Sequence, residues 1–278
     1  MERVGEHPVP AGPLAVRWLA YSLGEARAGT SVHARLRLEN AGTAPWRSRA
    51  RAGVQLAYHW LDSFGNPIVW DGVRATLPRV VQPGEDIELD VSVLSPRPPG
   101  GYRLAFDLVE EHRFWFQELG STPLDLEVEV RPRIDERLLR VVVEGGGHPA
   151  TEAALSAQEE SLVREEAVAT AYLVAGAEPD PSWSRLLLDA HAEGWAAVGA
   201  AVEVAGGFRA RGERARFAPW APGGGRNPRF DRPLLFPSLL DGLEPTTHAG
   251  LPAYSGTDAL FDGRAVVRLR QRSDRRNG

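Results

Sequence analysis

The sequence of 278 residues contains no cysteine, no lysine and a single methionine. Without cysteine the chain has no disulfides, no thiolate metal ligands and no cysteine nucleophile. Without lysine it has neither a P-loop phosphate lysine nor Schiff-base chemistry. No stretch approaches the roughly 20 apolar residues that span a bilayer, and residues 1–13 lack the basic-then-apolar order of a signal peptide. We therefore expect a soluble, cytoplasmic protein.

Charge and histidine content narrow the possible partners. The net charge is −5 at pH 7, whereas a nucleic-acid-binding surface is basic, so we expect no nucleic-acid partner. The seven histidines are scattered, with no HExxH pairing, and we expect no metal site and no cofactor. The composition, 43% hydrophobic and 25% charged, is that of an ordinary globular chain, and its length suggests about two domains.

The first half of the chain shows a period of two, broken by glycine and proline turns. Short strands at this spacing are typical of an immunoglobulin-like antiparallel β-sandwich. Alternation places Tyr58 and Trp60 on the core face and turns His59 and Asp107 away from it. The predicted strands are 15–21, 31–39, 54–61, 66–70, 86–94, 101–109, 112–117 and 123–130.

After residues 131–137 the pattern changes to continuous apolar runs, at 138–143, 167–175 and 195–204. Such runs joined by helices indicate an α/β domain with a parallel sheet covered on both faces. One helix is expected from about Pro149 to Val163. A second is expected to be capped by Asp180 and to end at Gly194, while the Gly-, Pro- and Arg-rich segment 206–278 predicts mostly loops.

These patterns divide the chain into four parts. The predicted parts are a flexible N-terminus (1–14), an immunoglobulin-like sandwich (15–132), an α/β domain (133–270) and a basic tail (271–278).

Several motifs of the first half are shared with a known module. They are "NAGTAPW" (40–46), "YHWLDSFGNPIVWDG" (58–72), "PRPPGGYRLAFDLVEE" (96–111) and "FWFQELG" (114–120). This part resembles the bacterial immunoglobulin-like module that accompanies glycosyltransferases and other proteins of surface-polysaccharide assembly, and is similar to the four-tryptophan domain. The resemblance implies a sandwich fold, and a link to glycans.

Five aromatic and polar residues form a candidate ligand-binding patch. An indole offers a flat apolar face to the C–H side of a sugar ring, while polar neighbours bond its hydroxyls. The candidates are His59, Trp70, Asp71, Arg74 and Trp115. The alternative is that the tryptophans are packing residues of the core, because each aromatic side chain can bury about 150–250 Å².

The second half carries the stretch "AYLVAGAEPDPSW" (171–183), an apolar strand followed by an acidic turn and a helix. Its order resembles the centre of family 2 glycosyltransferases of the GT-A fold. In that family the strand ends in Asp-x-Asp, whose carboxylates hold Mg²⁺ or Mn²⁺ on the sugar nucleotide. Gly176 stands where the first carboxylate belongs. Glu178 remains, with Asp180 two residues further on.

Two further departures from the family pattern agree with the loss of the first carboxylate. Only residues 163–166 separate the first helix from the next strand, where the family normally has another strand and helix. In "GTDALFDGRAVVRLR" (256–270), Gly263 and Arg264 stand at the positions of the acidic pair that includes the catalytic base, with Asp258 and Asp262 nearby. We therefore predict that the second half is a degenerate, truncated GT-A-like domain without catalytic residues.

We therefore predict a non-catalytic glycan-binding or scaffold protein, a pseudo-glycosyltransferase of surface-polysaccharide or glycoconjugate biosynthesis. Its expected partner is a glycan or a glycosyltransferase-type protein. One alternative is an active glycosyltransferase using Mg²⁺ or Mn²⁺ with Glu178, Asp180, Asp258 and Asp262. The other is a protein–protein interaction module with no sugar ligand.

Overall fold

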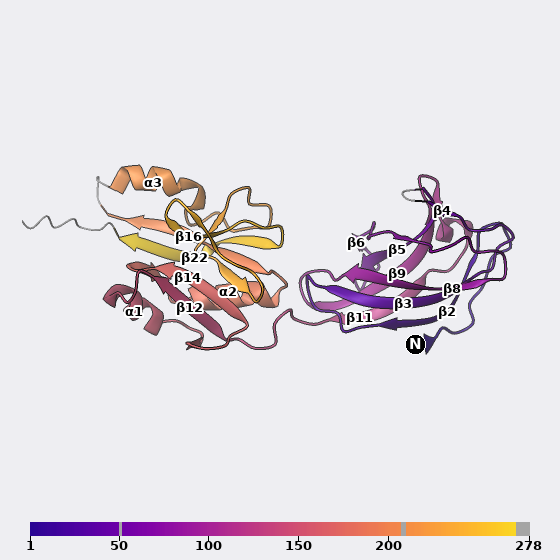
Figure 1. The fold of residues 1–278 in the computed structure, drawn as a ribbon, viewed down its shortest axis with the longest axis horizontal. Coiled ribbons are helices and arrows are strands. Elements are labelled where there is room, and N and C mark those ends of the chain that lie inside the picture. Colours follow the sequence, from indigo (N-terminus) through magenta and orange to yellow (C-terminus); the bar gives the residue numbers. More distant parts are fainter. Residues whose placement is uncertain (50–51, 207–209, 271–278) are drawn as a thin grey trace, which may run out of the picture. The chain divides into compact units, whose positions relative to one another are not determined.

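A computed structural model describes residues 1–49, 52–206 and 210–270. The chain divides into two compact units, Met1–Pro132 and Arg133–Gly278 (Figure 1). Both are built mostly of β-strands, with few helices. Over the described ranges, no helix combines the length and apolar character needed to cross a bilayer.

Over residues 1–49 and 52–132, the first unit consists of strands and one short 3-10 helix. Its elements are β1 (Glu2–Arg3), β2 (Val16–Leu23), β3 (Ser31–Asn40), β4 (Ser48–Arg49), β5 (Ala52–Leu61), β6 (Pro67–Val69), β7 (Ala75–Thr76), β8 (Asp86–Leu94), β9 (Gly100–Glu110), β10 (Phe114–Trp115), η1 (Phe116–Leu119) and β11 (Leu124–Val130).

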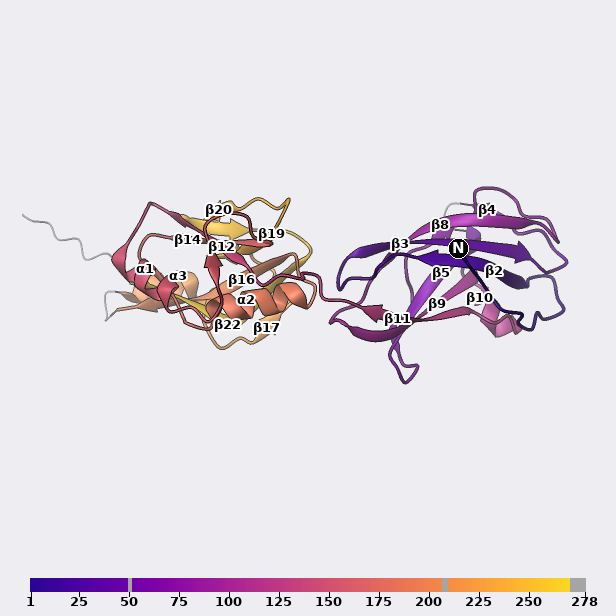
Figure 2. The same cartoon turned by 90° about the horizontal axis from the view of Figure 1, so that it is seen from below.

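These strands form two antiparallel sheets. One has the order β1-β2-β3-β8, and the other has β10-β9-β5-β4, with β11 paired to β9 and both β6 and β7 paired to β5. Figures 1 and 2 show β2 and β3 on one side and β5 and β9 on the other. Inward side chains from both sheets, among them the fully buried Trp46 and Trp60, make one hydrophobic core. The first unit is therefore a two-sheet sandwich.

The outer face of β5 and β9 differs from the expectation. His59 and Asp107 alternate away from the core as predicted, yet each is nearly inaccessible to solvent. The β6–β7 segment and the β10–η1 segment pack against this part of the sheet, as shown by the contacts of Trp70 and Trp115 with His59 and by the bond from the Gln117 amide to Asp107. Alternation predicts the side of a residue, and long-range packing decides whether that side is covered.

The ends of the first unit carry three ordered contacts. The Tyr102 hydroxyl donates to the carbonyl of Pro98 at 2.7 Å, which ties the start of β9 to the preceding turn. Within 1–14, where the sequence predicts a flexible segment, Glu2–Arg3 pairs with β2 and the Trp18 amide donates to His7 Nε2 at 3.3 Å.

The second unit combines a large sheet with short helices. Its elements are β12 (Leu139–Glu144), α1 (Pro149–Ser156), β13 (Leu162–Val163), β14 (Ala169–Val174), β15 (Ala177–Pro179), α2 (Trp183–Ala192), β16 (Ala197–Ala205), α3 (Arg211–Phe217), η3 (Ala218–Trp220), β17 (Arg226–Asn227), β18 (Leu234–Leu235), β19 (Ser238–Leu240), β20 (Thr246–His248), β21 (Leu251–Tyr254) and β22 (Ala259–Arg270).

The main sheet has the order β13-β12-β14-β19-β16-β22-β15, with β17 paired to β22. The pairs β12–β14 and β16–β22 are parallel, but β19 runs antiparallel between β14 and β16, and β15 runs antiparallel to β22. The sheet is therefore mixed rather than purely parallel. In Figure 1, α3 lies on one side of it and α1 and α2 on the other.

Three local expectations for this unit are wrong. The first helix ends at Ser156, and the second has Ser182 rather than Asp180 at its N-cap. The Asp180 carboxylate instead lies 3.5 Å from Arg268. The segment predicted to be mostly loops contains the 12-residue strand β22, whose cross-strand partner β16 is far away in sequence. The predicted basic tail, 271–278, lies outside the described residues.

Candidate functional site

Three aromatic side chains contact one another on the outer face of the β5–β9 sheet, and we call them the Trp70 platform: His59, Trp70 and Trp115. The imidazole of His59 stacks on the indole of Trp70, with 4.2 Å between ring centroids and 22° between planes. Trp115 meets the edges of both rings, at 4.4 Å from His59 and 6.2 Å from Trp70. The indole of Trp70 is therefore supported by His59 on one face and by Trp115 at its side.

Three elements position the platform. His59 lies on β5, Trp115 on β10, and Trp70 in the segment between β6 and β7. Gly72 allows this segment to approach the sheet, since its amide donates to the Tyr58 carbonyl at 3.0 Å. A Cβ atom at this position would lie 2.6 Å from the Tyr58 ring. Only glycine fits this close approach.

Trp70 presents one free face. Its side of contact with His59 is covered, yet the residue is 47% exposed, so solvent reaches the opposite face of the indole. The neighbouring Asp71 carboxylate is 68% exposed. A flat apolar ring beside an accessible hydrogen-bond acceptor can take an amphipathic ligand such as a sugar.

Arg74 is fully engaged beside the platform. Its guanidinium pairs with Asp71 at 2.6 Å and with Glu111 at 2.5 Å, and it lies over the Trp115 ring at 4.9 Å from the centroid. The guanidinium therefore orders Asp71 and Trp115, and its charge is neutralised within the site.

His59 is neutral in this setting. Burial lowers the pKa of its imidazole, and the Arg74 charge lowers it further. Its Nδ1 contacts the Trp70 carbonyl, which fixes the proton on Nδ1, while the buried Nε2 has no hydrogen-bond partner in the described structure. The stack is thus a neutral imidazole on an indole.

Asp107 lies on β9, on the same face of the sheet as His59, and contacts η1. Its two carboxylate oxygens accept from the amides of Leu108 at 2.8 Å and Gln117 at 3.1 Å. Burial raises the pKa of Asp107 to about 7. This burial was not predicted from the sequence, because the contact of Asp107 with η1 depends on tertiary packing.

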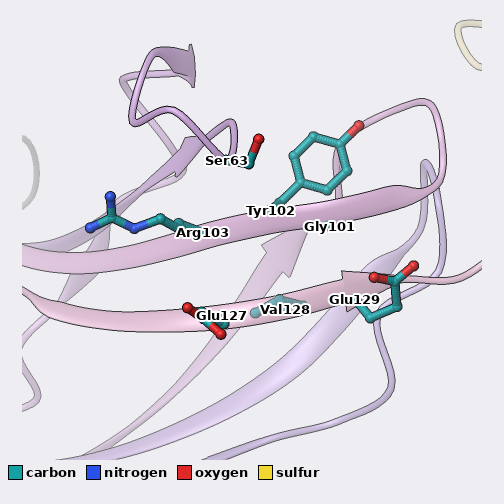
Figure 3. Close-up of a pocket in the computed structure, with 7 residues that line it drawn as sticks. All are labelled: Ser63, Gly101, Tyr102, Arg103, Glu127, Val128 and Glu129. Atoms are coloured by element: carbon teal, nitrogen blue, oxygen red, sulfur yellow. The ribbon is translucent and has the colours of Figure 1, made fainter.

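A second feature of this unit is an open trough of about 430 Å³ over β9 and β11. Figure 3 shows Ser63 on the loop above the strands, with Glu127 and Glu129 on the neighbouring strand. The trough residues are Ser63, Gly101, Tyr102, Arg103, Glu127, Val128 and Glu129. None of them was proposed as a site residue from the sequence, because the trough depends on which strands become neighbours.

The carboxylates expected for a glycosyltransferase are engaged by arginines. Glu178 lies on β15 with its Oε1 at 2.6 Å from the guanidinium of Arg270, and Asp180 lies beside Arg268. Gly176 has a φ of 88°, and its amide donates to the Thr151 hydroxyl at 3.0 Å. Glycine therefore serves the turn at the end of β14, where other residues are strained.

The other two carboxylates lie at different places in the sheet. Asp258 precedes β22 and pairs with Arg133 at 2.6 Å. Asp262 lies within β22, is fully buried, and pairs with Arg264 at 2.6 Å. Among the described residues, no group of three or more acidic or histidine side chains is arranged to hold a metal ion. The structure thus separates the four carboxylates into ion pairs.

No protein-family model matches the sequence, and neither does any curated protein. Among solved structures, the C-terminal domain of wzt matches 46% of this chain and 78% of its own length, at 12% identity and a TM-score of 0.33. A beta-glucosidase from Listeria innocua in complex with glucose matches 41% of this chain at 15% identity and a TM-score of 0.25. The chain spans only 15% of that enzyme's length.

A third structure, the putative ApaA protein from Bordetella pertussis, matches 45% of this chain and all of its own, at 16% identity and a TM-score of 0.22. At TM-scores of this size, similarity assigns neither fold family nor ligand. The function has to be argued from the site itself.

Proposed function

We propose that this chain is a non-catalytic glycan-binding protein whose ligand stacks on the free face of Trp70. The observation that carries the proposal is the exposed indole braced by His59 and Trp115. Because the ring is already held in place, binding costs little further ordering of the side chain. The exposed Asp71 carboxylate, ordered by Arg74, supplies a hydrogen-bond acceptor beside the ring.

The proposal assigns the first unit to the immunoglobulin-like class and the second to a degenerate GT-A-like domain that does not transfer sugar. Support for the latter comes from the order of β12, β14, α2 and β16 along the chain and from the ion pairs of Glu178 and Asp262. A carboxylate bound to a guanidinium is a poor ligand for a divalent cation and a poor general base. We place such a protein in the cytoplasm, acting in surface-polysaccharide or glycoconjugate assembly with a glycosyltransferase-type partner.

The test is calorimetric titration of the full chain with a panel of neutral and acidic oligosaccharides. Trp70→Ala should lower the affinity for any bound glycan at least tenfold, about 1.4 kcal/mol. The matched control is Leu94→Ala on β8, because Leu94 is also an exposed apolar side chain, 50% accessible, but lies in the opposite sheet. Unchanged binding by Trp70→Ala, or no glycan binding by the native chain at millimolar ligand, would overturn the proposal.

A second function is favoured by a separate observation. Three apolar side chains of the segment between β5 and β7 are exposed: Phe64 at 89%, Val73 at 67% and Ile68 at 45%. Exposed apolar surface can mark a protein-binding site. If the native chain binds no glycan, and Phe64→Ser combined with Ile68→Ser abolishes an association seen by analytical ultracentrifugation, the first unit is a protein-interaction module.

A further inference from the structure

The Trp70 platform and the trough lie on the same face of the same sheet. His59 of β5 is opposite Ala105 of β9, and Leu61 is opposite Arg103. Arg103 lines the trough, so the backbone of His59, which supports Trp70, and the near end of the trough differ by two residues along the strands. At about 3.3 Å per residue this separation is roughly 7 Å. One extended ligand can therefore reach both.

The trough owes its depth to a missing side chain. Gly101 is opposite Glu129 in the β9–β11 ladder, and a Cβ atom on Gly101 would lie 3.7 Å from the Glu129 carboxylate. A larger residue is thus sterically allowed here but would occupy the trough. Ser63, Glu127 and Glu129 line the remaining space with hydroxyl and carboxylate groups, which can hydrogen-bond sugar hydroxyls.

Charge restricts the class of ligand. The Arg103 guanidinium pairs with Asp125 on the neighbouring strand, and Arg74 is engaged by two carboxylates. Glu127 and Glu129, in contrast, make no ion pair within the described part of the chain. Carboxylates therefore outnumber the available guanidiniums along this face, and a uronate, phosphate or sulfate would meet like charge without a free cation.

We propose that the ligand is a linear, uncharged oligosaccharide of several sugar units, with one unit on Trp70 and the following units in the trough. This inference rests on the proposed glycan binding and adds to it the length and charge of the ligand. It also assigns Gly101, Glu127 and Glu129 to binding. The like charge of the exposed Glu127 and Glu129 disfavours an anionic glycan.

Ligand length is tested by titrating the full chain with neutral gluco-, manno- and galacto-oligosaccharides of one to six units. Affinity should rise with length by at least tenfold. Gly101→Leu should abolish this gain while leaving the shortest bound ligand unaffected. The control, Ser92→Leu, adds the same side chain to an exposed position of the opposite sheet and should change nothing. The inference is overturned if affinity does not depend on oligosaccharide length, or if Gly101→Leu shows the same increase of affinity with length as the native chain.

Ligand charge is tested with oligogalacturonides of the same lengths. The native chain should bind them at least tenfold more weakly than the best neutral glycan. The double variant Glu127→Gln, Glu129→Gln should reduce this difference in affinity. Glu88→Gln, on an exposed position of β8, is the control. Equal or tighter native binding of galacturonides overturns the inference but leaves the proposed function standing. Absence of all glycan binding overturns both.

Discussion

The imidazole of His59 lies under the indole of Trp70, with 4.2 Å between the ring centroids, and one residue is nearly fully buried while the other is 47% exposed. The buried ring thus supports an exposed one. This relationship separates residues that maintain the fold from residues available to a ligand, and it leads to measurable differences between variants.

Trp60 and Trp70 should respond oppositely to truncation. Trp60 is fully buried in the sandwich core, and its indole N–H donates to the Leu94 carbonyl at 2.9 Å. Trp60→Ala should therefore cost about 3–5 kcal/mol of unfolding free energy. Trp70→Ala should cost about 1 kcal/mol or less, because half of the residue is already in water. Urea unfolding of both variants checks this, and a comparable loss in Trp70→Ala would mean that the ring is a core residue.

His59 should matter to binding through Trp70. His59→Ala removes the support under the indole and should weaken glycan binding several-fold, because an aromatic pair contributes about 0.5–1.5 kcal/mol. His59→Phe keeps a ring under the indole and should retain most of the affinity. Titration of both variants with the same oligosaccharide measures their affinities, and fluorescence anisotropy measures the mobility of the indoles. Equal affinities for the two variants would show that the stack does not position Trp70.

Asp107 should make the first unit less stable as the pH rises. Its pKa is about 7 when folded against 3.8 as the ordinary value, so the folded state binds the proton more tightly. Stability from this group is present below pH 4 and is lost as the pH rises through 7. The difference corresponds to about 4 kcal/mol.

Asp107→Asn should reduce the pH dependence of the unfolding free energy between pH 4.5 and 8, because Asn cannot ionise. This holds even if the substitution also changes the stability by a constant amount. Hydrogen exchange of the β5 and β9 amides across this range measures it for the first unit alone. If the native and Asn proteins show parallel pH profiles, the Asp107 carboxylate is ionised in the folded state.

His191 should have the opposite effect in the second unit. It is fully buried, Nε2 contacts the Ser238 hydroxyl at 2.8 Å, and burial lowers its pKa to about 4. The unfolded state then takes up a proton first, so stability is lost as the pH falls from 6.5 toward 4, by about 3 kcal/mol. His191→Phe should remove this acid sensitivity. Exchange of the α2 amides at pH 4.5 and 7.5 checks it, and persistence of the sensitivity would implicate other groups.

Restoring the missing carboxylate at Gly176 should not restore a metal site. Gly176→Asp places a side chain at a φ of 88° and should cost about 1–2 kcal/mol. Glu178 would still be held by Arg270, so Mn²⁺ affinity should remain weaker than millimolar by electron paramagnetic resonance titration. The control is Gly146→Asp, at a similar φ of 87°. Submillimolar Mn²⁺ binding specific to Gly176→Asp would show that the arginine does not block the site.

Local patterns predicted much of the secondary structure. The strand expected at 86–94 coincides with β8, and Tyr58 and Trp60, which alternation placed on the core face, are buried. Period-two patterns succeed because each strand faces a core on one side. The strand β22 was missed because its burial comes from β16 and α2, which are distant in sequence.

The candidate site was predictable as a set of residue types but not as a geometry. The sequence proposed His59, Trp70, Asp71, Arg74 and Trp115 as one patch, and the structure adds the contacts between them and the burial of His59 under Trp70. Nothing in the sequence pointed to Glu111 as the second partner of Arg74, because this contact joins residues 37 positions apart. The need for Gly72 likewise depends on the nearness of Tyr58.

The sequence by itself determined the chemistry that is absent, since no fold can supply cysteine or lysine, and it determined the alternation that builds the sandwich. The tertiary structure decided which polar groups are buried and which are free. It covered Asp107 and His59, exposed one face of Trp70, and paired Glu178 with Arg270. The physical reason is that solvent exposure and ion pairing depend on distances between residues remote in sequence, which no local pattern encodes.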